Sequence, residues 1–373
     1  MKFESQNLRP LNKFGVNCIA TNYFRFTEVS ELDNLAKSRS LDQRNVLILG
    51  GGSNILLPEK FDGVVLHPCN DKIELLDQDL SSIIVRAHAG LEWDRFVTHC
   101  VGNGWGGLEN LSLIPGNVGA APVQNIGAYG REACELIEQV TCYDLATNEV
   151  VILSKQNCEF SYRNSIFKRR PELLVISVDF KLHKPRTALL RSLKGDKKSI
   201  SGVAAEFKKI ISLVTKDFRF GPKTKWRPQV SFDNIRTLLD IDLIPISLKR
   251  RLVCLIRRKT MPDPAKIGNV GCFFKSPIVK SSIADSIKTA YPKISLYPGT
   301  PGTYKVSAGD LIRECGWAGK KIGDVSINAR RPLIILNHGN ASAKEILNFS
   351  KSVQSDVQKK FNITIEPEVV IVQ

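Results

Sequence analysis

The sequence predicts a globular protein of the α+β class, and three observations lead to that prediction. Patterns typical of strands and of helices occur together, without the regular strand–helix–strand repeat of a doubly wound parallel sheet. Two glycine-rich stretches interrupt these patterns. At 373 residues, the chain is long enough for two or three domains that each have a core.

The first half is predicted to consist mainly of short strands. The stretch NVLILGGGSNILL (45–57) is typical of two buried strands around a glycine loop. Short strands are expected within 64–90, and LEWDRFVTHCVGNGW (91–105) has helical spacing that ends at glycines. Further strands are expected over 139–147, 149–154 and 173–182.

The second half begins with a basic segment and continues with a smaller mixed region. Residues 185–225 are basic and poor in aromatic residues, and they are predicted to be an insertion or a linker. A basic helix is expected over 248–259. After the helix-breaking stretch MPDPAKIGN, a strand is expected over 331–337, a helix over 342–360 and a closing strand over 363–372.

The formal net charge of +16 suggests an anionic partner, and the excess lies mainly between Lys181 and Lys259. This segment lacks the aromatic residues of a base-stacking surface, so a solvated basic insertion is favoured over a nucleic-acid site. A phosphate-bearing ligand near this basic segment is the alternative that stays open. The N-terminus lacks a signal-peptide pattern and no apolar run is long enough to cross a bilayer, so a cytoplasmic protein without a membrane partner is expected.

Nine cysteines are scattered along the chain, and none of them forms a C-x-x-C pair. The five histidines do not stand at metal-ligand spacing beside them. This pattern argues against a zinc site and against a disulfide framework. We therefore expect no metal, and we expect most of the cysteines to be small buried apolar residues.

The glycine-rich stretches are candidates for a phosphate site. We name GGGSN (50–54) the first glycine loop and IPGNVGAAPVQNIGAYG (114–130) the second glycine loop. Glycine permits positive φ and close approach of a backbone to a ligand, and free N–H groups suit a diphosphate, although turn formation alone also explains a glycine cluster. Neither loop has the spacing of a Rossmann fingerprint or a P-loop. Gln124 and Asn125 could hydrogen-bond a flat heteroaromatic ring.

Five stretches carry a family resemblance. LGGGSN, GLENLSLIPGNVGAAPVQNIGAYG, FSYRNSIFK, MPDP…GNVGCFFKSP and FNITIEPEV occur in this order. Together they resemble the UDP-N-acetylenolpyruvoylglucosamine reductase (MurB) family, from about residue 8 to the end, interrupted by the basic insertion. The resemblance implies an oxidoreductase that uses FAD and NADPH, and that completes UDP-N-acetylmuramate for peptidoglycan and cell wall synthesis.

The resemblance also implies a fold and its domains. The fold is the FAD-binding fold of the MurB and vanillyl-alcohol-oxidase type in two subdomains, with a separate α+β substrate domain. The two FAD-binding subdomains are expected over 1–70 and 71–184, with the C-terminal strand 361–373 joining the second. The basic insertion, a connecting basic helical segment and the substrate domain are expected over 185–225, 226–260 and 261–360.

The cofactor-binding residues that the resemblance implies lie in the two glycine loops. They are Gly50, Gly51, Gly52, Ser53, Asn54, Ile114, Pro115, Gly116, Gly119, Ala120, Gln124, Asn125, Gly127, Ala128, Tyr129 and Gly130. Members of the family transfer hydride from flavin N5 to one carbon of an enolpyruvyl double bond. An arginine of the SYR motif and a glutamate of the EPEV motif then serve the enolate, and these are Arg163 and Glu366 here. From the residues alone, a surface salt bridge and a strand-end carboxylate are the alternatives.

Cys272 stands where the family usually has a serine that gives a proton to carbon. A thiol, with an ordinary pKa near ~8.5, is a far easier proton source than an alcohol. The adjacent phenylalanines would keep water away. The alternative is that Cys272 fills space and that water supplies the proton.

Several substrate-contact positions depart from the family pattern. The positions carried over are Tyr162, Phe232, Arg258, Lys259, Lys275, Ser276 and Arg331. The departures are Phe232 for tyrosine, Thr260 for lysine, Ser276 for asparagine, Ala318 for lysine and Arg331 for glutamine. Extra basic residues could compensate for the lost contacts, the substrate could be shifted, or the chain could be a copy of declining activity.

Three hypotheses therefore remain. The leading one is an NADPH-consuming, FAD-dependent reductase of UDP-N-acetylglucosamine enolpyruvate that acts as a monomer. The second is a divergent flavoenzyme of the same fold that acts on another nucleotide sugar or enol acid. The third is a non-catalytic module that binds RNA or a membrane surface on an old flavin scaffold.

Overall fold

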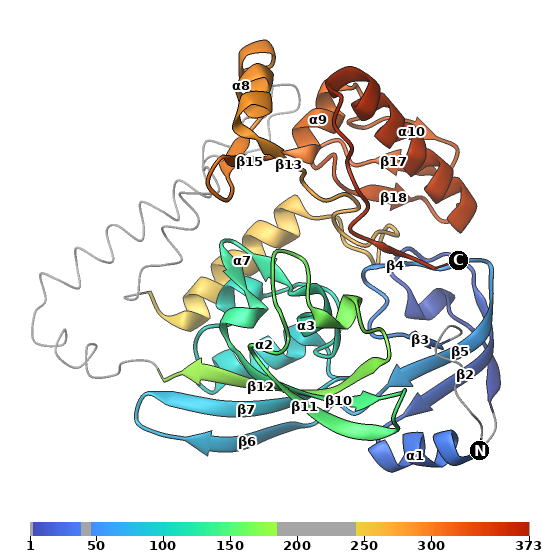
Figure 1. Ribbon diagram of the computed structural model, residues 1–373, viewed down its shortest axis with the longest axis vertical. Helices are drawn as coiled ribbons and strands as arrows, with labels where there is room; N and C mark the ends of the chain where they lie inside the picture. The colour runs from blue at the N-terminus through green and yellow to red at the C-terminus, as the bar shows by residue number, and fades with distance from the viewer. Residues whose placement is uncertain (1–2, 39–45, 185–243, 373) are drawn as a thin grey trace, which may run out of the picture.

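The chain folds into two sheets and a smaller mixed lobe (Figure 1). The computed structural model describes residues 3–38, 46–184 and 244–372. The predicted insertion 185–225 and Phe232 lie outside these residues. Helices and strands are mixed without a regular strand–helix–strand repeat, as the sequence predicts.

A four-stranded sheet in the order β1-β2-β5-β3 begins the fold. Its strands are β1 (Glu4–Asn7), β2 (Ile19–Phe26), β3 (Val46–Ile48) and β5 (Lys60–Pro68). The helices η1 (Arg9–Leu11) and α1 (Val29–Ser38) follow β1 and β2. The short strand β4 (Ile55–Leu56) follows the first glycine loop. The pair β3 and β4 confirms the prediction of two strands around a glycine loop.

A five-stranded antiparallel sheet, in the order β11-β10-β12-β7-β6, forms the second layer. Its strands are β6 (Ile73–Gln78), β7 (Ser82–His88), β10 (Ile137–Asp144), β11 (Glu149–Ser154) and β12 (Leu173–His183). The helix α2 (Trp93–Gly102) packs on it, because the Trp93 and Phe96 rings lie 5.9 and 4.9 Å from the ring of Phe180. The expected helix and strands are confirmed here.

Short elements carry the second glycine loop and the segment after it. They are η3 (Glu109–Leu111), α3 (Ala120–Gln124), β8 (Gly127–Ala128), β9 (Arg131–Glu132), η4 (Ala133–Glu135) and η5 (Ile166–Lys168). The loop approaches the end of β7 so closely that a Cβ on Gly119 would lie 2.7 Å from the Cβ of Ala89. Only glycine fits at this position without a shift of the backbone.

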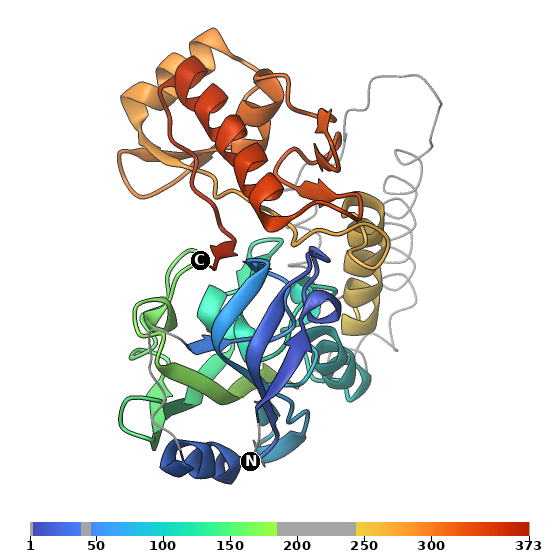
Figure 2. The same ribbon diagram turned by 90° about the vertical axis from the view of Figure 1, so that its right-hand side faces the viewer.

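The helix α7 (Ile246–Thr260) connects the sheets to the C-terminal lobe. It confirms the basic helix expected over 248–259. The helix packs against α2 and η3 through a face that contains Leu252, Val253 and Ile256. Figures 1 and 2 show α7 just beneath the lobe. Its polar residues therefore stand where the lobe meets the second glycine loop.

The C-terminal lobe combines two small sheets with three helices. Its elements are β13 (Ile278–Lys280), α8 (Ser281–Ala290), β14 (Leu296–Pro298), β15 (Thr303–Val306), α9 (Ala308–Glu314), β16 (Lys321–Ile322), β17 (Val325–Ile327), β18 (Ile335–Asn337) and α10 (Ala343–Phe361). A capping box between Ser342 and Glu345 begins α10, and left-handed Asn362 ends it. The helix predicted over 342–360 is confirmed.

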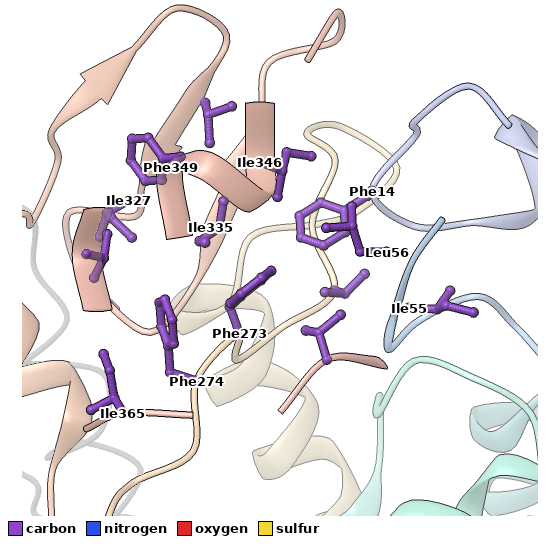
Figure 3. Close-up of a cluster of buried hydrophobic side chains, with 14 of the residues drawn as sticks. Phe14, Ile55, Leu56, Phe273, Phe274, Ile327, Ile335, Ile346, Phe349 and Ile365 are labelled. Carbon is purple, nitrogen blue, oxygen red and sulfur yellow. The ribbon is translucent and has the colours of Figure 1, made fainter. Parts of the chain in front are cut away.

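One hydrophobic core joins the lobe to the N-terminal part of the chain. Phe273 and Phe274 lie between Phe14 and Leu56 on one side and side chains of α10, such as Phe349, on the other (Figure 3). All five residues are buried. Because this cluster draws on both ends of the chain, the turn that carries Cys272 is held between the two parts.

The final strand corrects one expectation. The C-terminal segment was expected to join residues 71–184, but β19 (Val370–Ile371) pairs in parallel with β4. Of the strand expected over 363–372, only these two residues form one. Pro367 has no N–H to donate and forms an isolated bridge with Phe274. Figure 2 shows this segment returning from the lobe. Its return places Glu368 beside the first glycine loop, because the Asn54 amide donates to the Glu368 carbonyl.

All nine cysteines are free. Within 3–38, 46–184 and 244–372, no group of three or more His, Cys, Asp or Glu side chains could hold a metal ion. Among the helices of the same ranges, none has both the length and the apolar character needed to span a membrane.

Replacing Phe273 with alanine should lower the free energy of unfolding by about 3–5 kcal/mol, because the ring is fully buried and its loss leaves a cavity. Urea unfolding followed by circular dichroism measures this. The control is Ile278→Ala, which truncates a side chain that is 60% exposed and should change stability by less than about 0.5 kcal/mol. Equal effects of the two substitutions would contradict the position assigned to Phe273.

Candidate functional site

The two glycine loops lie directly against each other. A Cβ on Gly51 would stand 2.9 Å from Cα of Gly116, and the Ser53 hydroxyl donates to the carbonyl of Pro115 over 2.9 Å. Glycine at these positions is therefore a requirement of the contact between the loops. The first glycine loop also touches the C-terminal segment, since the Asn54 amide donates to the carbonyl of Glu368 over 3.3 Å.

The first glycine loop carries backbone donors without a partner among the described residues. In the part of the chain that the structure describes, no hydrogen bond uses the N–H groups of residues 50–54 as donors. A run of unpaired N–H groups in a turn is a site for an anion, and a diphosphate fits this chemistry. The donor set of the loop thus fits the FAD that the sequence implies.

Asn125 corrects the expectation that its side chain faces a ring. The residue is fully buried, in the left-handed conformation that ends α3. Its amide nitrogen donates to Glu132 and to the carbonyl of Ser161, over 2.8 and 3.0 Å, and its amide oxygen accepts from the N–H of Cys134. Every polar atom of this side chain is engaged, so Asn125 shapes the second glycine loop.

Arg163 is anchored on the second glycine loop. It lies in a tight turn with φ of +54°. Its two terminal nitrogens donate to the carbonyls of Asn125 and Gly127, over 3.1 and 2.8 Å. Its Nε lies 3.1 Å from Oε1 of Glu368. The guanidinium group is thus held in one orientation with its charge paired.

The glutamate that pairs with Arg163 is Glu368, and the structure does not bring the predicted Glu366 to this arginine. The Glu368 side chain is 14% exposed and accepts a second hydrogen bond from Gln124 Nε2 over 2.8 Å. In contrast, the Glu366 side chain is 72% exposed and lies 3.8 Å from Lys275 Nζ. The two glutamates stand two residues apart on the same side of an extended segment, so the alternation of side chains gave no signal to separate them.

Cys272 lies beside this pair. It follows Gly271, which has φ of +76°, and its side chain is half-buried. Burial raises the pKa of the thiol, and the negative charge of Glu368 raises it further. Positive charges act in the opposite direction, and they belong to Arg331, Arg163 and Arg257. The net result is a thiol that keeps its proton at neutral pH.

The cluster contains a second arginine that the sequence analysis missed. Arg257 of α7 hydrogen-bonds with Tyr129 and donates from Nε to the carbonyl of Leu113 over 3.3 Å. Burial lowers the pKa of Arg257. The predicted Arg258 and Lys259 lie on the exposed face of α7 instead, outside the cluster. Helical spacing was the available signal, because Arg257 stands one turn after a buried valine.

Lys305 of β15 is a further residue that sequence reasoning missed. Its Nζ lies 4.7 Å from the ring centre of Tyr162 and 5.6 Å from that of Tyr297. Burial lowers the pKa of Lys305, and the charge of Arg163 lowers it further. A lysine of the lobe thus contacts the SYR motif, and this cation–π contact brings the two sides of the site together.

The other predicted substrate positions differ in their surroundings. Arg331 acts electrostatically on both Cys272 and Tyr129, so it belongs to the cluster. The Ser276 hydroxyl accepts from the N–H of Ala308 over 3.4 Å, at the start of α9. The Thr260 hydroxyl donates to the carbonyl of Ile256 over 2.9 Å, so it bonds its own helix.

Two family models match the chain. The C-terminal domain of UDP-N-acetylenolpyruvoylglucosamine reductase matches residues 263–372, and an FAD binding domain matches residues 21–154. The second match contains both glycine loops. The cofactor chemistry that the donors of the first loop suggest is therefore that of an FAD-binding domain.

Full-length relatives agree with these matches. The UDP-N-acetylenolpyruvoylglucosamine reductases of Bordetella pertussis and Chromobacterium violaceum are 35% and 37% identical to the chain. The alignments cover 99% and 98% of this chain and 95% and 97% of those proteins. The crystal structure of the reductase (MurB) from Thermus caldophilus aligns over the whole of both chains with a TM-score of 0.61 at 22% identity. The predicted fold, its FAD-binding part and the family resemblance are confirmed.

Lys168 should make stability depend on pH. Its Nζ donates to the carbonyl of Arg163 over 2.7 Å. Burial lowers its pKa to about 8, and Lys275 contributes to the shift. Between pH ~8 and ~10.5 the unfolded chain therefore binds more protons here than the folded protein, so this group adds stability as pH rises. Below pH ~8 the full penalty of the buried charge is present.

We expect the difference in unfolding free energy between the wild type and Lys168→Met to shift in favour of the wild type by about 1–2 kcal/mol from pH 7.5 to pH 10. Urea unfolding at both pH values measures this. Lys155→Met, in which another lysine that donates to a backbone carbonyl is replaced, is the control for the loss of one charge. A shift of opposite sign would show that Lys168 is not buried as described.

Proposed function

Because the chain belongs to the UDP-N-acetylenolpyruvoylglucosamine reductase family, we propose that it reduces the enolpyruvyl group of UDP-N-acetylglucosamine enolpyruvate to give UDP-N-acetylmuramate. The enzyme is an FAD-dependent oxidoreductase that uses NADPH. The observation that carries the proposal is the convergence of Arg163, Cys272 and Glu368 beside the two glycine loops. A monomer that acts in the cytoplasm, with no nucleic-acid or membrane partner, is part of the proposal.

The residues that would hold FAD are those of the glycine loops. The free N–H groups of residues 50–54 would take the diphosphate, and the second loop would lie along the rest of the cofactor. When bound, FAD takes hydride from NADPH and supplies it to one carbon of the enolpyruvyl double bond. The carbon next to the carboxylate then carries enolate charge, and the protein must stabilise and protonate it.

Arg163 would stabilise this enolate. Its guanidinium group is fixed by two carbonyls and by Glu368, so it needs no reorganisation as negative charge develops. Glu368 in turn is fixed by Gln124. Arg257 and Arg331 add positive charge on the side of Cys272. We assign the carboxylate and enolate of the substrate to this group of charges.

Cys272 would give the proton to the enolate carbon. Because burial raises the pKa of the thiol, the sulfur carries its proton at neutral pH, and that proton is still far more acidic than the proton of an alcohol. The buried rings of Phe273 and Phe274 follow in sequence and restrict access of water. The two-electron reduction is complete once hydride and proton have each added to one carbon.

A second candidate is a reductase of the same fold that acts on another nucleotide sugar or enol acid. The bond between Thr260 and its own helix supports it, because this position offers no cation to a phosphate. Stopped-flow reoxidation of the reduced enzyme decides between the two. Rapid reoxidation by UDP-N-acetylglucosamine enolpyruvate, but not by simple enol acids, supports the first function. The reverse preference supports the second.

Replacing Cys272 with alanine should lower turnover about 10²–10⁴-fold, because the proton donor is removed. Reduction of the flavin by NADPH should stay within about twofold of the wild-type rate, since no proton is given at that step. Cys272→Ser should retain part of the turnover, because a hydroxyl occupies the same position. Undiminished turnover in the alanine variant would dismiss Cys272 as donor.

Replacing Glu368 with glutamine should lower kcat about 10²-fold, because the charge that orients Arg163 is lost. The matched control is Glu366→Gln, two residues earlier, which should stay within about twofold of the wild type. Steady-state kinetics at saturating NADPH measures both. The opposite ranking would return the catalytic role to Glu366.

A further inference from the structure

Leu113, the residue just before the second glycine loop, is held in place by residues outside the loop. Its φ is +56°, a conformation that is uncommon for a residue with a side chain. Its N–H donates to Oδ1 of Asp94 over 2.6 Å. Asp94 lies in the first turn of α2, and its side chain is 17% exposed. The unusual backbone is thus tied to a half-buried carboxylate.

Asp94 is in turn held by α7. Arg250 donates from its two terminal nitrogens to the two carboxylate oxygens, both over 2.8 Å, and also to the hydroxyl of Thr98 over 2.6 Å. This is the two-pronged pairing that gives arginine–carboxylate contacts their directionality. Burial alone would raise the pKa of Asp94, yet the bonds from Arg250 and from Leu113 lower it, so the carboxylate is ionised.

The same helix holds Leu113 a second time. Arg257 stands two turns after Arg250 on α7, and its Nε donates to the carbonyl of Leu113 over 3.3 Å. The helix therefore fixes both backbone polar groups of this residue, the N–H through Asp94 and the carbonyl directly. The rest of the loop is tied to α2 itself, because the N–H of Trp93 donates to the carbonyl of Gly116 over 2.9 Å.

We propose that Asp94 and Arg250 are positioning residues of the FAD site, which hold the second glycine loop in the conformation that receives the cofactor. The proposal rests on the function proposed above. The pair touches neither Cys272 nor Arg163, so it acts on the affinity for FAD and leaves the chemistry at the substrate unchanged. Loss of the pair frees Leu113 to leave its uncommon conformation, while the contact of Trp93 with Gly116 keeps the loop on α2.

The test measures release of FAD from the purified holoenzyme. The protein is diluted, and the recovery of flavin fluorescence is followed for the wild type, Asp94→Asn, Arg250→Met and Arg250→Lys. Release should be 10-fold faster or more in the first two variants, and intermediate in Arg250→Lys, because lysine keeps the charge but not the fork. The double variant should release FAD no more than about threefold faster than either single variant, since both break one interaction.

Two controls make the result specific. Arg95 lies in α2, the helix of Asp94, and forms an exposed pair with Asp71 outside that helix. Arg95→Met breaks this pair and should release FAD at the wild-type rate. With FAD added to saturation, kcat of Asp94→Asn should return to within about twofold of the wild type. If Arg250→Met does not fold, the other two variants still test the proposal. Asp94→Asn keeps the shape of the side chain, and Arg250→Lys keeps its charge.

Each outcome has one meaning. A wild-type protein that holds no flavin overturns the proposed function. A wild-type protein that holds FAD, with variants that release it at the same rate, overturns this inference alone. A loss of kcat that saturating FAD does not restore also overturns it, since the pair would then act on the chemistry. Multiplicative effects in the double variant would show that Asp94 and Arg250 act separately.

Discussion

The ion pair between Arg163 and Glu368 is the interaction on which the site depends. Moving a charge out of water costs free energy unless the charge is paired and hydrogen-bonded. Here Arg163 and Glu368 pair with each other, Arg163 also donates to a backbone carbonyl, and Glu368 also accepts from Gln124. The pair can form only where the C-terminal segment returns to the first glycine loop. The pairing of β19 with β4, the bridge between Phe274 and Pro367 and the core around Phe273 all secure this return. These contacts of the fold together bring the Glu368 carboxylate to the Arg163 guanidinium group.

The same arrangement sets the electrostatic environment of Cys272. The half-buried Cys272 thiol is subject to the negative charge of Glu368 and to the positive charges of three arginines. Burial keeps the thiol neutral, and the positive charges would stabilise a negative charge on sulfur if Cys272 gives its proton as proposed. These surroundings are compatible with the proposed role of Cys272 as a proton donor.

The sequence predicted most of the regular elements, because their apolar periodicity is strong. The helix α10, with its capping box, and the strand β12, with its apolar run, lie where they were expected. The glycine loops were also found, since glycine is required at positions such as Gly51 and Gly119, where a Cβ would meet a neighbouring atom. What escaped prediction depends on contacts between distant segments. Glu368 and Glu366 share one side of an extended segment, and Lys305 lies in a strand with no motif around it.

The adjacent Arg257 and Arg258 show a further limit. The spacing of buried residues along α7 distinguishes the inward-facing Arg257 from the exposed Arg258, and this spacing can be read from the sequence. The family pattern instead pointed to the basic residues nearest the stretch MPDP. For Asn125 the residue type indicated a ligand contact, yet its amide hydrogen-bonds to Glu132 and to the backbone of Ser161 instead. Polar residues in a glycine loop serve the backbone as readily as a ligand.

The bond between Asn54 and Glu368 joins residues that are 314 positions apart in the chain. Closing so long a loop costs chain entropy before any contact in it is gained, whereas the hairpins β6–β7 and β10–β11 of the five-stranded sheet close over short loops. We therefore expect the Glu368 carboxylate to reach Arg163 late in folding, after the sheets have formed. A polypeptide with nearly all of its regular structure can still be one that has not yet become an enzyme.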